Sequence, residues 1–208
     1  MGKLYTIGHS LYDKEKFLYL IKIYNISYLL DVRSTPYSKH APQFNADVIG
    51  KYLEENSVHY VPMGKRFGAR QKDMSLYDED GILNFDKTRQ TVFFQNAVGS
   101  VIKGLNSGSN IVLMCTEKNP IDCHRTILIS KAFYDIGIPV NHILSNGKYI
   151  TQDDINKELL DMYFPDRAQM TLLDMINGVR DDKELLEEAY RKRNKEIGYQ
   201  IIQMSKAL

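Results

Sequence analysis

The fold is decided by the stretch I-V-L-M-C-T-E-K-N-P-I-D-C-H-R, residues 111–125. Its first four residues are all apolar, which is typical of a strand buried on both faces of a sheet. Pro120 and Asp122 are common residues at the beginning of a helix. The stretch therefore predicts a central strand, a polar loop and a helix from about Cys123 to Ile136, which Gly137 ends.

Further strands and helices alternate with this unit along the chain. After Asp13, whose carboxylate we expect to cap a helix, the apolar spacing is helical. Short apolar runs predict strands at residues 3–7, 27–32, 58–62 and 139–144, and helical spacing predicts helices at residues 45–56 and 89–105. This alternation predicts an α/β fold, with a doubly wound, mainly parallel sheet and helices on both faces. Residues 1–150 are expected to form this domain, and residues 151–208 a C-terminal helical extension.

Charge and composition exclude several classes of protein. The formal net charge is +1, so there is no global field to attract nucleic acid or an anionic membrane, and anion binding must come from local clusters. Two cysteines cannot form the disulfide framework of a small secreted domain. Because we find neither a signal peptide nor an apolar run of about 18 residues, we expect a cytoplasmic protein without a membrane partner. The oligomeric state is left open.

Three predicted strands end in polar loops: G-H-S at residues 8–10, D-V-R at residues 31–33 and C-T-E at residues 115–117. In an open parallel sheet these loops lie at the same edge, where ligands bind near the point at which the strand order reverses. The helix after the third loop adds free backbone N–H groups that favour an anion. We expect one polar site here, in which a thiol beside Arg125 or a protonated His124 has a lowered pKa.

The candidate site residues divide into two groups. Those able to act as nucleophile, acid or base are His9, Asp31, Cys115 and Glu117. Those that offer hydrogen bonds or positive charge to a substrate are Ser10, Arg33, Ser38, Arg66, Arg70, Cys123, His124 and Arg125. Structural alternatives stand beside these roles: an ion pair between Asp31 and Arg33, cysteines that only pack, and a glutamate that pairs with Arg125 or caps a helix.

No cofactor and no metal site are predicted. The C-x7-C-H spacing of Cys115, Cys123 and His124 differs from zinc motifs, whose paired ligands usually lie two to four residues apart. A metal ion held by these three residues, with or without His9, is the alternative. His142 lies in an apolar strand and is expected to be a core histidine.

Residues 63–85 form a long connector with little periodicity, which is typical of a functional loop. Three glycines, Gly64, Gly68 and Gly81, are candidate hinges of a mobile lid. The connector also carries a basic cluster with Phe67 inside it: Lys65, Arg66, Arg70 and Lys72. Such a cluster can bind phosphates and stack on a base, and a solvated charge run is the alternative.

Four segments together resemble the domain-of-unknown-function 488 family. They are T-I-G-H-S at residues 6–10, L-L-D-V-R-S-T-P-Y-S at residues 29–38, C-T-E-K-N-P-I-D-C-H-R at residues 115–125 and G-I-P-V-N-H-I at residues 137–143. The resemblance spans about residues 4–145. It implies a fold and the position of a site, but no reaction.

A more distant similarity is to the rhodanese layout, in which L-L-D-V-R at residues 29–33 is followed by I-V-L-M-C at residues 111–115. That resemblance implies that Cys115 carries a persulfide held by the following loop. The loop departs from the rhodanese pattern, because it is longer, has no glycine, and contains Pro120 and a second cysteine.

Together these features predict an enzyme acting on an anionic, phosphate-bearing substrate, such as a nucleotide or a nucleic-acid end. Arg33, Arg125 and the basic cluster of residues 65–72 would hold the anion, and Cys115 or Glu117 would do nucleophilic or acid–base work. The alternatives are sulfur transfer by Cys115, a non-catalytic nucleotide- or DNA-binding module, and a scaffold whose C-terminal helices mediate assembly.

Overall fold

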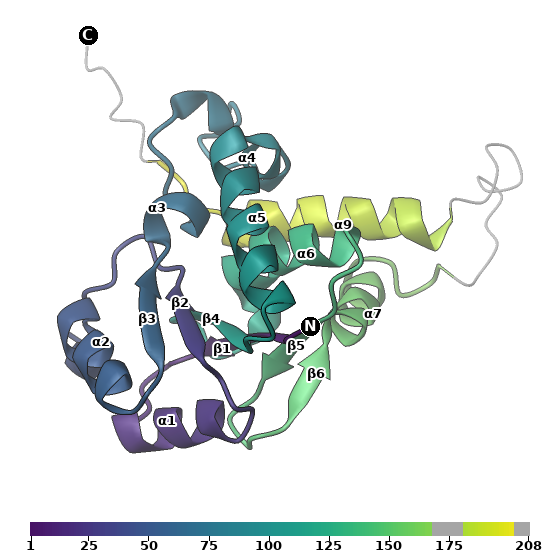
Figure 1. Ribbon diagram of the computed structural model, residues 1–208. Helices are drawn as coiled ribbons and strands as arrows, with labels where there is room; N and C mark the ends of the chain where they lie inside the picture. Colours follow the sequence, from purple (N-terminus) through teal and green to yellow (C-terminus); the bar gives the residue numbers. More distant parts are fainter. Residues whose placement is uncertain (168–180, 202–208) are drawn as a thin grey trace, which may run out of the picture.

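The computed structural model describes residues 1–167 and 181–201, and these form an α/β structure around one six-stranded sheet (Figure 1). The strands are β1 (Leu4–Gly8), β2 (Tyr28–Asp31), β3 (His59–Pro62), β4 (Ile111–Cys115), β5 (Val140–Ile143) and β6 (Tyr149–Thr151). Their order is β3-β2-β4-β1-β5-β6, and only the pairing of β5 with β6 is antiparallel. The predicted α/β class with a mainly parallel sheet is confirmed.

Helices cover both faces of this sheet. The longer ones are α1 (Lys14–Lys22), α2 (Ala46–Glu55), α5 (Val92–Asn106), α7 (Gln152–Tyr163) and α9 (Asp182–Ile197). The shorter ones are η1 (Pro42–Phe44), α3 (Gly64–Phe67), η2 (Met74–Leu76), α4 (Phe85–Gln90), η3 (Pro120–Asp122), η4 (Arg125–Ser130) and α6 (Lys131–Asp135). Of the described helices, none is long and apolar enough to cross a membrane.

The strand order places the polar loops together. From β1 the chain moves to β2 and β3 on one side, and then returns through β4 to β5 on the other. Right-handed crossovers in opposite directions put α1 and α2 on one face and α5 and α6 on the other, as Figure 1 shows. The strand order therefore reverses at β4. The carboxyl ends of β4 and of its two neighbours, β2 and β1, lie side by side.

Most elements form where the periodicity predicts them. Every residue of β4 is buried, as its apolar run requires, and it lies between β2 and β1. The carboxylate of Asp13 accepts the N–H of Lys16 at 2.6 Å and caps α1 as predicted.

The structure differs from the predicted elements in three places. The helix predicted from Arg89 is interrupted at Thr91, whose hydroxyl caps the beginning of α5 and separates it from α4. The helix predicted after Cys123 begins as the π-helical segment η4 and becomes α-helical only at Lys131. Strand β6 was not predicted, although the Asn-Gly pair at residues 146–147 is a hairpin signal.

The connector at residues 63–85 contains regular structure. Helix α3, the single turn η2 and a bridge between Tyr77 and Leu83 lie within it. Gly64 allows a close approach, since a Cβ there would lie 2.1 Å from the carbonyl oxygen of Arg33. Gly81 has a φ of +76° in a turn. The hinge role of these glycines stays a prediction.

Helices α7 and α9 share the hydrophobic cluster of the sheet. Ile155 and Leu159 of α7 and Ala189 and Tyr190 of α9 are buried in the cluster that also holds α5 and β4. The described part of the predicted extension is thus built into the core. The part at residues 168–180 and 202–208 lies outside the described residues.

Candidate functional site

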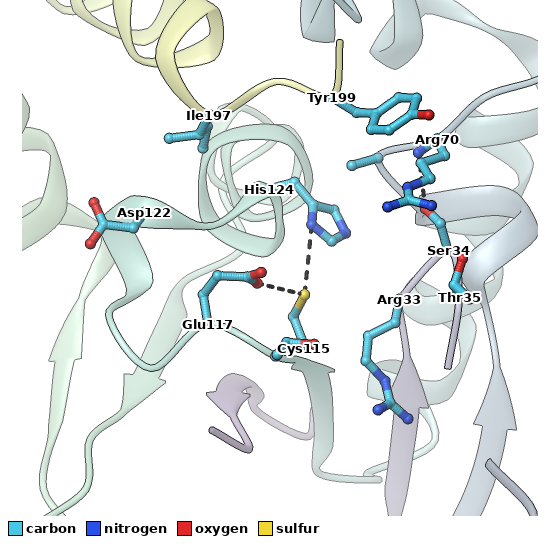
Figure 2. A pocket seen from close by; sticks show the side chains of 12 residues that line it. Arg33, Ser34, Thr35, Arg70, Cys115, Glu117, Asp122, His124, Ile197 and Tyr199 are labelled. Carbon is cyan, nitrogen blue, oxygen red and sulfur yellow. Dashed lines mark hydrogen bonds between the residues drawn. The ribbon is translucent and has the colours of Figure 1, made fainter. Parts of the chain in front are cut away.

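A pocket of about 260 Å³ lies at the carboxyl ends of β2 and β4. One wall carries Cys115, Thr116, Glu117, Asp122 and His124, and the other carries Arg33, Ser34, Thr35, Ala69 and Arg70; Ile197 and Tyr199 line the pocket at and after the end of α9. Figure 2 shows the two walls, with the chain after α9 crossing above them. The site therefore draws on four parts of the chain that are far apart in sequence.

The loop after β4 lies against the end of β1. The N–H of His9 donates to the carbonyl of Cys115 and that of Ser10 to Thr116, each at 2.9 Å. A Cβ at Gly8 would lie 1.8 Å from the carbonyl oxygen of Glu117, so only glycine permits this approach. The G-H-S motif therefore fixes the backbone of the loop that carries the thiol.

Two thiols, a carboxylate and an imidazole meet at the base of the pocket. Glu117 Oε2 lies 3.0 Å from the Sγ of Cys115 and 3.0 Å from the Sγ of Cys123. The Nδ1 of His124 lies 3.7 Å and 3.9 Å from the same two sulfur atoms. Both cysteines are free and buried, whereas Glu117 is the exposed member of the cluster.

The two thiols differ in their electrostatic surroundings. Burial raises the pKa of Cys123, but the hydrogen bond from Cys115 and the charges of Arg125 and His124 outweigh it and leave the pKa well below its usual value. The hydrogen bond to Cys123 and burial raise the pKa of Cys115. The sequence predicts a lowered pKa for a thiol near Arg125 and His124. In the structure this thiol is Cys123, because the two adjacent thiols titrate as a pair and Cys123 loses its proton first.

Glu117 has a raised pKa. Although the residue as a whole is exposed, its carboxyl end lies against the sulfur atoms, and the loss of water there is the main cause; the negative charge of Cys123 adds to it. Burial lowers the pKa of His124, but its hydrogen bond to Cys123 and the charges of Cys123 and Glu117 outweigh this and raise it. A carboxyl group whose pKa moves toward neutrality is suited to acid–base work.

Arg125 lies beneath the cluster and is 0% exposed. Its Nη1 donates to the carbonyl of Glu117 at 2.6 Å and its Nη2 to that of Lys118 at 3.3 Å, while its Nε donates to Thr6 Oγ1 at 3.3 Å. Its donors thus hold the backbone of the loop after β4. The predicted contact of Arg125 with a substrate anion stays a prediction.

Asp31 and Arg33 form a buried ion pair at the end of β2. The Nε and Nη2 of Arg33 donate to the two carboxylate oxygens of Asp31 at 2.8 Å and 2.5 Å. Tyr60 donates to the same carboxylate at 2.6 Å. One edge of Arg33 lines the pocket, although Figure 2 shows its guanidinium turned away from Cys115.

His9 lies behind this ion pair. Its ring is 1% exposed, stacks on Phe44 at 4.2 Å and accepts from Arg33 Nη1 at 3.1 Å. Burial, reinforced by the charge of Arg33, lowers the pKa of His9 to about 4. His9 is therefore neutral at pH 7 and positions Arg33. Its catalytic role stays a prediction.

The basic cluster predicted at residues 65–72 lines a second cavity of about 600 Å³. Ser34 and Arg70 line both cavities, so the two adjoin. The guanidinium groups of Arg70 and Arg66 are exposed and lie over aromatic rings, those of Tyr199 at 4.6 Å and Phe93 at 5.7 Å.

The structure brings most of the predicted residues to one edge of the sheet. Ser38 is placed in a turn instead, where its Oγ accepts the N–H of His40. Prediction missed Ser34 and Thr35, which directly follow Arg33 in the S-T-P-Y-S loop. Ile197 and Tyr199 carried no sequence signal, because only the docking of α9 brings them to the pocket. The core position predicted for His142 is confirmed, since it is 0% exposed.

Fold and site together define a doubly wound α/β protein with a thiol, carboxylate and imidazole cluster where the strand order reverses. The chain belongs to the family described as Domain of unknown function DUF488, whose family model matches residues 13–132. No curated protein and no solved structure matches the chain.

Proposed function

We propose that this protein is an enzyme that acts on a small anionic substrate bearing a phosphate group, such as a nucleotide or a nucleic-acid end. One observation carries the proposal: the Cys115–Glu117–Cys123–His124 cluster faces the exposed Arg70 across one pocket. Reactive groups and a positive charge therefore border the same space.

Anion binding is supported by the wall opposite the cluster. Arg70 is exposed, and its backbone N–H donates to Ser34 Oγ at 2.9 Å, which fixes the base of its side chain. Arg66 and the two lysines of the basic cluster extend the positive surface into the adjoining cavity. Two connected cavities of about 260 Å³ and about 600 Å³ suit a small molecule or a chain end rather than a duplex.

Glu117 is the acid–base residue in this proposal. It is exposed to the pocket, its carboxylate lies at the sulfur atoms, and its pKa is raised. The buried thiols beneath it are held by β4 and by the segment that begins η4. A substrate held by Arg70 would thus present its reacting group to Glu117 and the sulfur cluster.

The test is to assay Glu117→Gln and Cys115→Ser on a panel of nucleotides and phosphate esters. For a substrate that the wild type converts, we expect Glu117→Gln to lower kcat by about 100-fold or more while substrate still binds, because removal of a general acid–base typically costs that much. Glu55→Gln is the matched control, since this exposed glutamate lies on α2, across the sheet.

Two outcomes would contradict the proposal. Turnover that is unchanged in both variants would place the chemistry elsewhere. A phosphate-bearing ligand that raises the Tm of the wild type but is never converted would make the protein a binding module. A mass gain of one sulfur on Cys115 after incubation with thiosulfate would instead support the sulfur-transfer alternative.

A further inference from the structure

The sulfur cluster has the geometry of a metal site. Cys115 Sγ, Cys123 Sγ and a ring nitrogen of His124 all lie within 4.8 Å of one another. Zinc bonds of about 2.3 Å to sulfur and about 2.0–2.2 Å to nitrogen or oxygen place the ligand atoms of a tetrahedral site roughly 3.6 Å apart. The observed 3.7 Å and 3.9 Å between sulfur and Nδ1 are close to this spacing. The ring nitrogen of His124 therefore already lies at nearly the distance from each sulfur atom that a shared Zn²⁺ ion requires.

His124 is oriented as metal-binding histidines are. Its Nε2 lies 3.1 Å from the backbone carbonyl oxygen of Val32 and donates to it. This hydrogen bond fixes the ring and leaves the Nδ1 directed at the two sulfur atoms. Histidine ligands of metals almost always donate their other ring N–H to a carbonyl or carboxylate in this way.

The ligand atoms are held by a rigid framework. Cys115 is the last residue of the central strand, and Cys123 follows the turn η3 directly. Arg193 of α9 donates to the carbonyl of Ile121 within that turn at 3.1 Å, and Arg125 holds the loop from below. The backbone around the two cysteines is therefore held in place by strand pairing and by two buried or partly buried arginines.

A fourth position is available on the pocket side. Glu117 Oε2 lies 3.0 Å from both sulfur atoms, and the residue is exposed. Three protein ligands with a fourth position open to a carboxylate, water or substrate are typical of catalytic rather than structural zinc sites. Sulfur and imidazole ligands favour Zn²⁺ over Mg²⁺ or Ca²⁺.

From this geometry we infer that Cys115, Cys123 and His124 bind a Zn²⁺ ion whose fourth position opens on the pocket beside Glu117, which keeps its acid–base role. The inference rests on the proposed function for the role of the ion in the reaction, whereas binding itself is measured without a substrate. It revises the expectation from the C-x7-C-H spacing, because the fold brings together ligands that the spacing does not indicate. His9 does not join the set, since its Nε2 is paired with Arg33.

The experiment uses the reduced 208-residue chain, freed of metal with a chelator. Zn²⁺ is titrated while the reactivity of the two thiols toward an alkylating reagent is followed, and bound metal is counted by mass spectrometry. Co²⁺ is titrated separately, because thiolate coordination gives charge-transfer absorption in the near ultraviolet and a tetrahedral site gives visible bands. We expect one ion per chain, both thiols protected, and the thiolate absorption of Co²⁺.

Variants identify the ligands. Loss of an outer-shell partner weakens metal binding by about 10–100-fold, so we expect Cys123→Ser and His124→Asn to weaken Zn²⁺ binding by more than about 100-fold. The matched control is His59→Asn, an exposed histidine at the beginning of the edge strand β3, where it pairs with Glu54 of α2. If a variant fails to fold, thiol protection and Co²⁺ absorption in the wild type still decide the question.

The outcomes separate this inference from the proposed function. Wild-type protein that neither takes up Zn²⁺ nor shows Co²⁺–thiolate absorption overturns the metal site. So does a Cys115–Cys123 disulfide that forms under mild oxidation in a chain that takes up no metal. Binding of a phosphate ester by the metal-free protein would support the anion pocket whether or not the metal site exists. Metal uptake without turnover of any substrate would support the metal site and contradict the proposed function.

Discussion

The arginines around the pocket divide into a buried pair and an exposed pair. Arg33 and Arg125 are 6% and 0% exposed, and their guanidinium groups donate to Asp31 and to backbone carbonyls. Arg66 and Arg70 are exposed and lie over aromatic rings at the surface. Burial of a guanidinium group destabilises the folded state unless its N–H groups form hydrogen bonds. The N–H groups of Arg33 and Arg125 are therefore used to hold the loops.

This difference assigns the two pairs to different tasks. The buried pair sets the conformation of the loops that carry the thiols and Glu117, and the exposed pair keeps N–H donors free for a ligand. All four had been predicted from sequence to bind the substrate anion. The comparison predicts that removing a buried arginine lowers stability, whereas removing an exposed one lowers affinity.

The largest effect is expected for Arg125→Ala. The carbonyls of Glu117 and Lys118 lose their partner and a cavity opens, so the free energy of unfolding should fall by about 3–5 kcal/mol. Urea denaturation followed by circular dichroism measures this. Arg191→Ala, on the exposed side of α9, is the control and should change stability by less than about 0.5 kcal/mol. A loss below about 1 kcal/mol for Arg125→Ala would show that the loop after β4 keeps its conformation without the hydrogen bonds from Arg125.

The next largest effect is a dependence of stability on pH, and it involves His142, which is linked to Arg125 by hydrogen bonds. The Nε of Arg125 donates to Thr6, whose hydroxyl donates to the Nδ1 of His142, and the Nε2 of His142 donates to Gln152. Burial, reinforced by the charge of Arg125, lowers the pKa of His142 to about 3. The folded protein therefore keeps this ring neutral, while the unfolded chain takes up a proton below about pH 6.5.

It follows that His142 contributes stability above about pH 6.5 that is lost as the pH falls toward 3. At pH 5 the His142 contribution to this loss should be up to about 2 kcal/mol relative to pH 7.5, and His9, whose pKa is also lowered, adds to the total. Urea denaturation at both pH values measures it. His142→Asn should reduce this pH dependence, and His59→Asn, at an exposed site, should leave it unchanged. Equal pH dependence in wild type and His142→Asn would contradict the assignment.

A smaller effect is expected for Arg70→Ala, and it should appear in affinity. One charge-assisted hydrogen bond contributes about 1.5–3 kcal/mol, so the Kd for a phosphate ester should rise about 10-fold or more. Stability should fall by no more than about 1 kcal/mol, the contribution of the exposed cation–π contact with Tyr199. Calorimetric titration and urea denaturation of the same sample give both values, with Arg191→Ala as the control. Equal losses of stability for Arg70→Ala and Arg125→Ala would remove the distinction between the two pairs.

The smallest effect is expected for Tyr199→Leu. The ring lies 4.6 Å from the Arg70 guanidinium, and an exposed cation–π contact contributes about 0.5–1 kcal/mol. The affinity for the phosphate ester should therefore fall by about 2–5-fold. Tyr19→Leu, an exposed tyrosine on α1, is the control. A loss as large as that for Arg70→Ala would mean that Tyr199 contacts the ligand itself.

Local patterns determined most of the fold. The apolar runs of the parallel strands, the cap at Asp13 and the alternation with helices are short-range signals, and the structure bears them out. The break at Thr91 was missed because a hydroxyl that caps a helix is also tolerated within one. The π-helical segment η4 was missed because its residues pack against α4 and α9, which lie far away in the chain and which local spacing does not reveal.

For the site, the sequence by itself determined which loops meet, because the carboxyl ends of parallel strands share one edge of a sheet. Only the tertiary structure decided which side chains face solvent. The sequence alone does not distinguish an arginine whose N–H groups bind backbone carbonyls, such as Arg125, from one whose side chain is exposed, such as Arg70. Tertiary structure likewise brought Tyr199 to the pocket and gathered two thiols, Glu117 and His124 within contact, since burial and distance depend on residues far away in the chain.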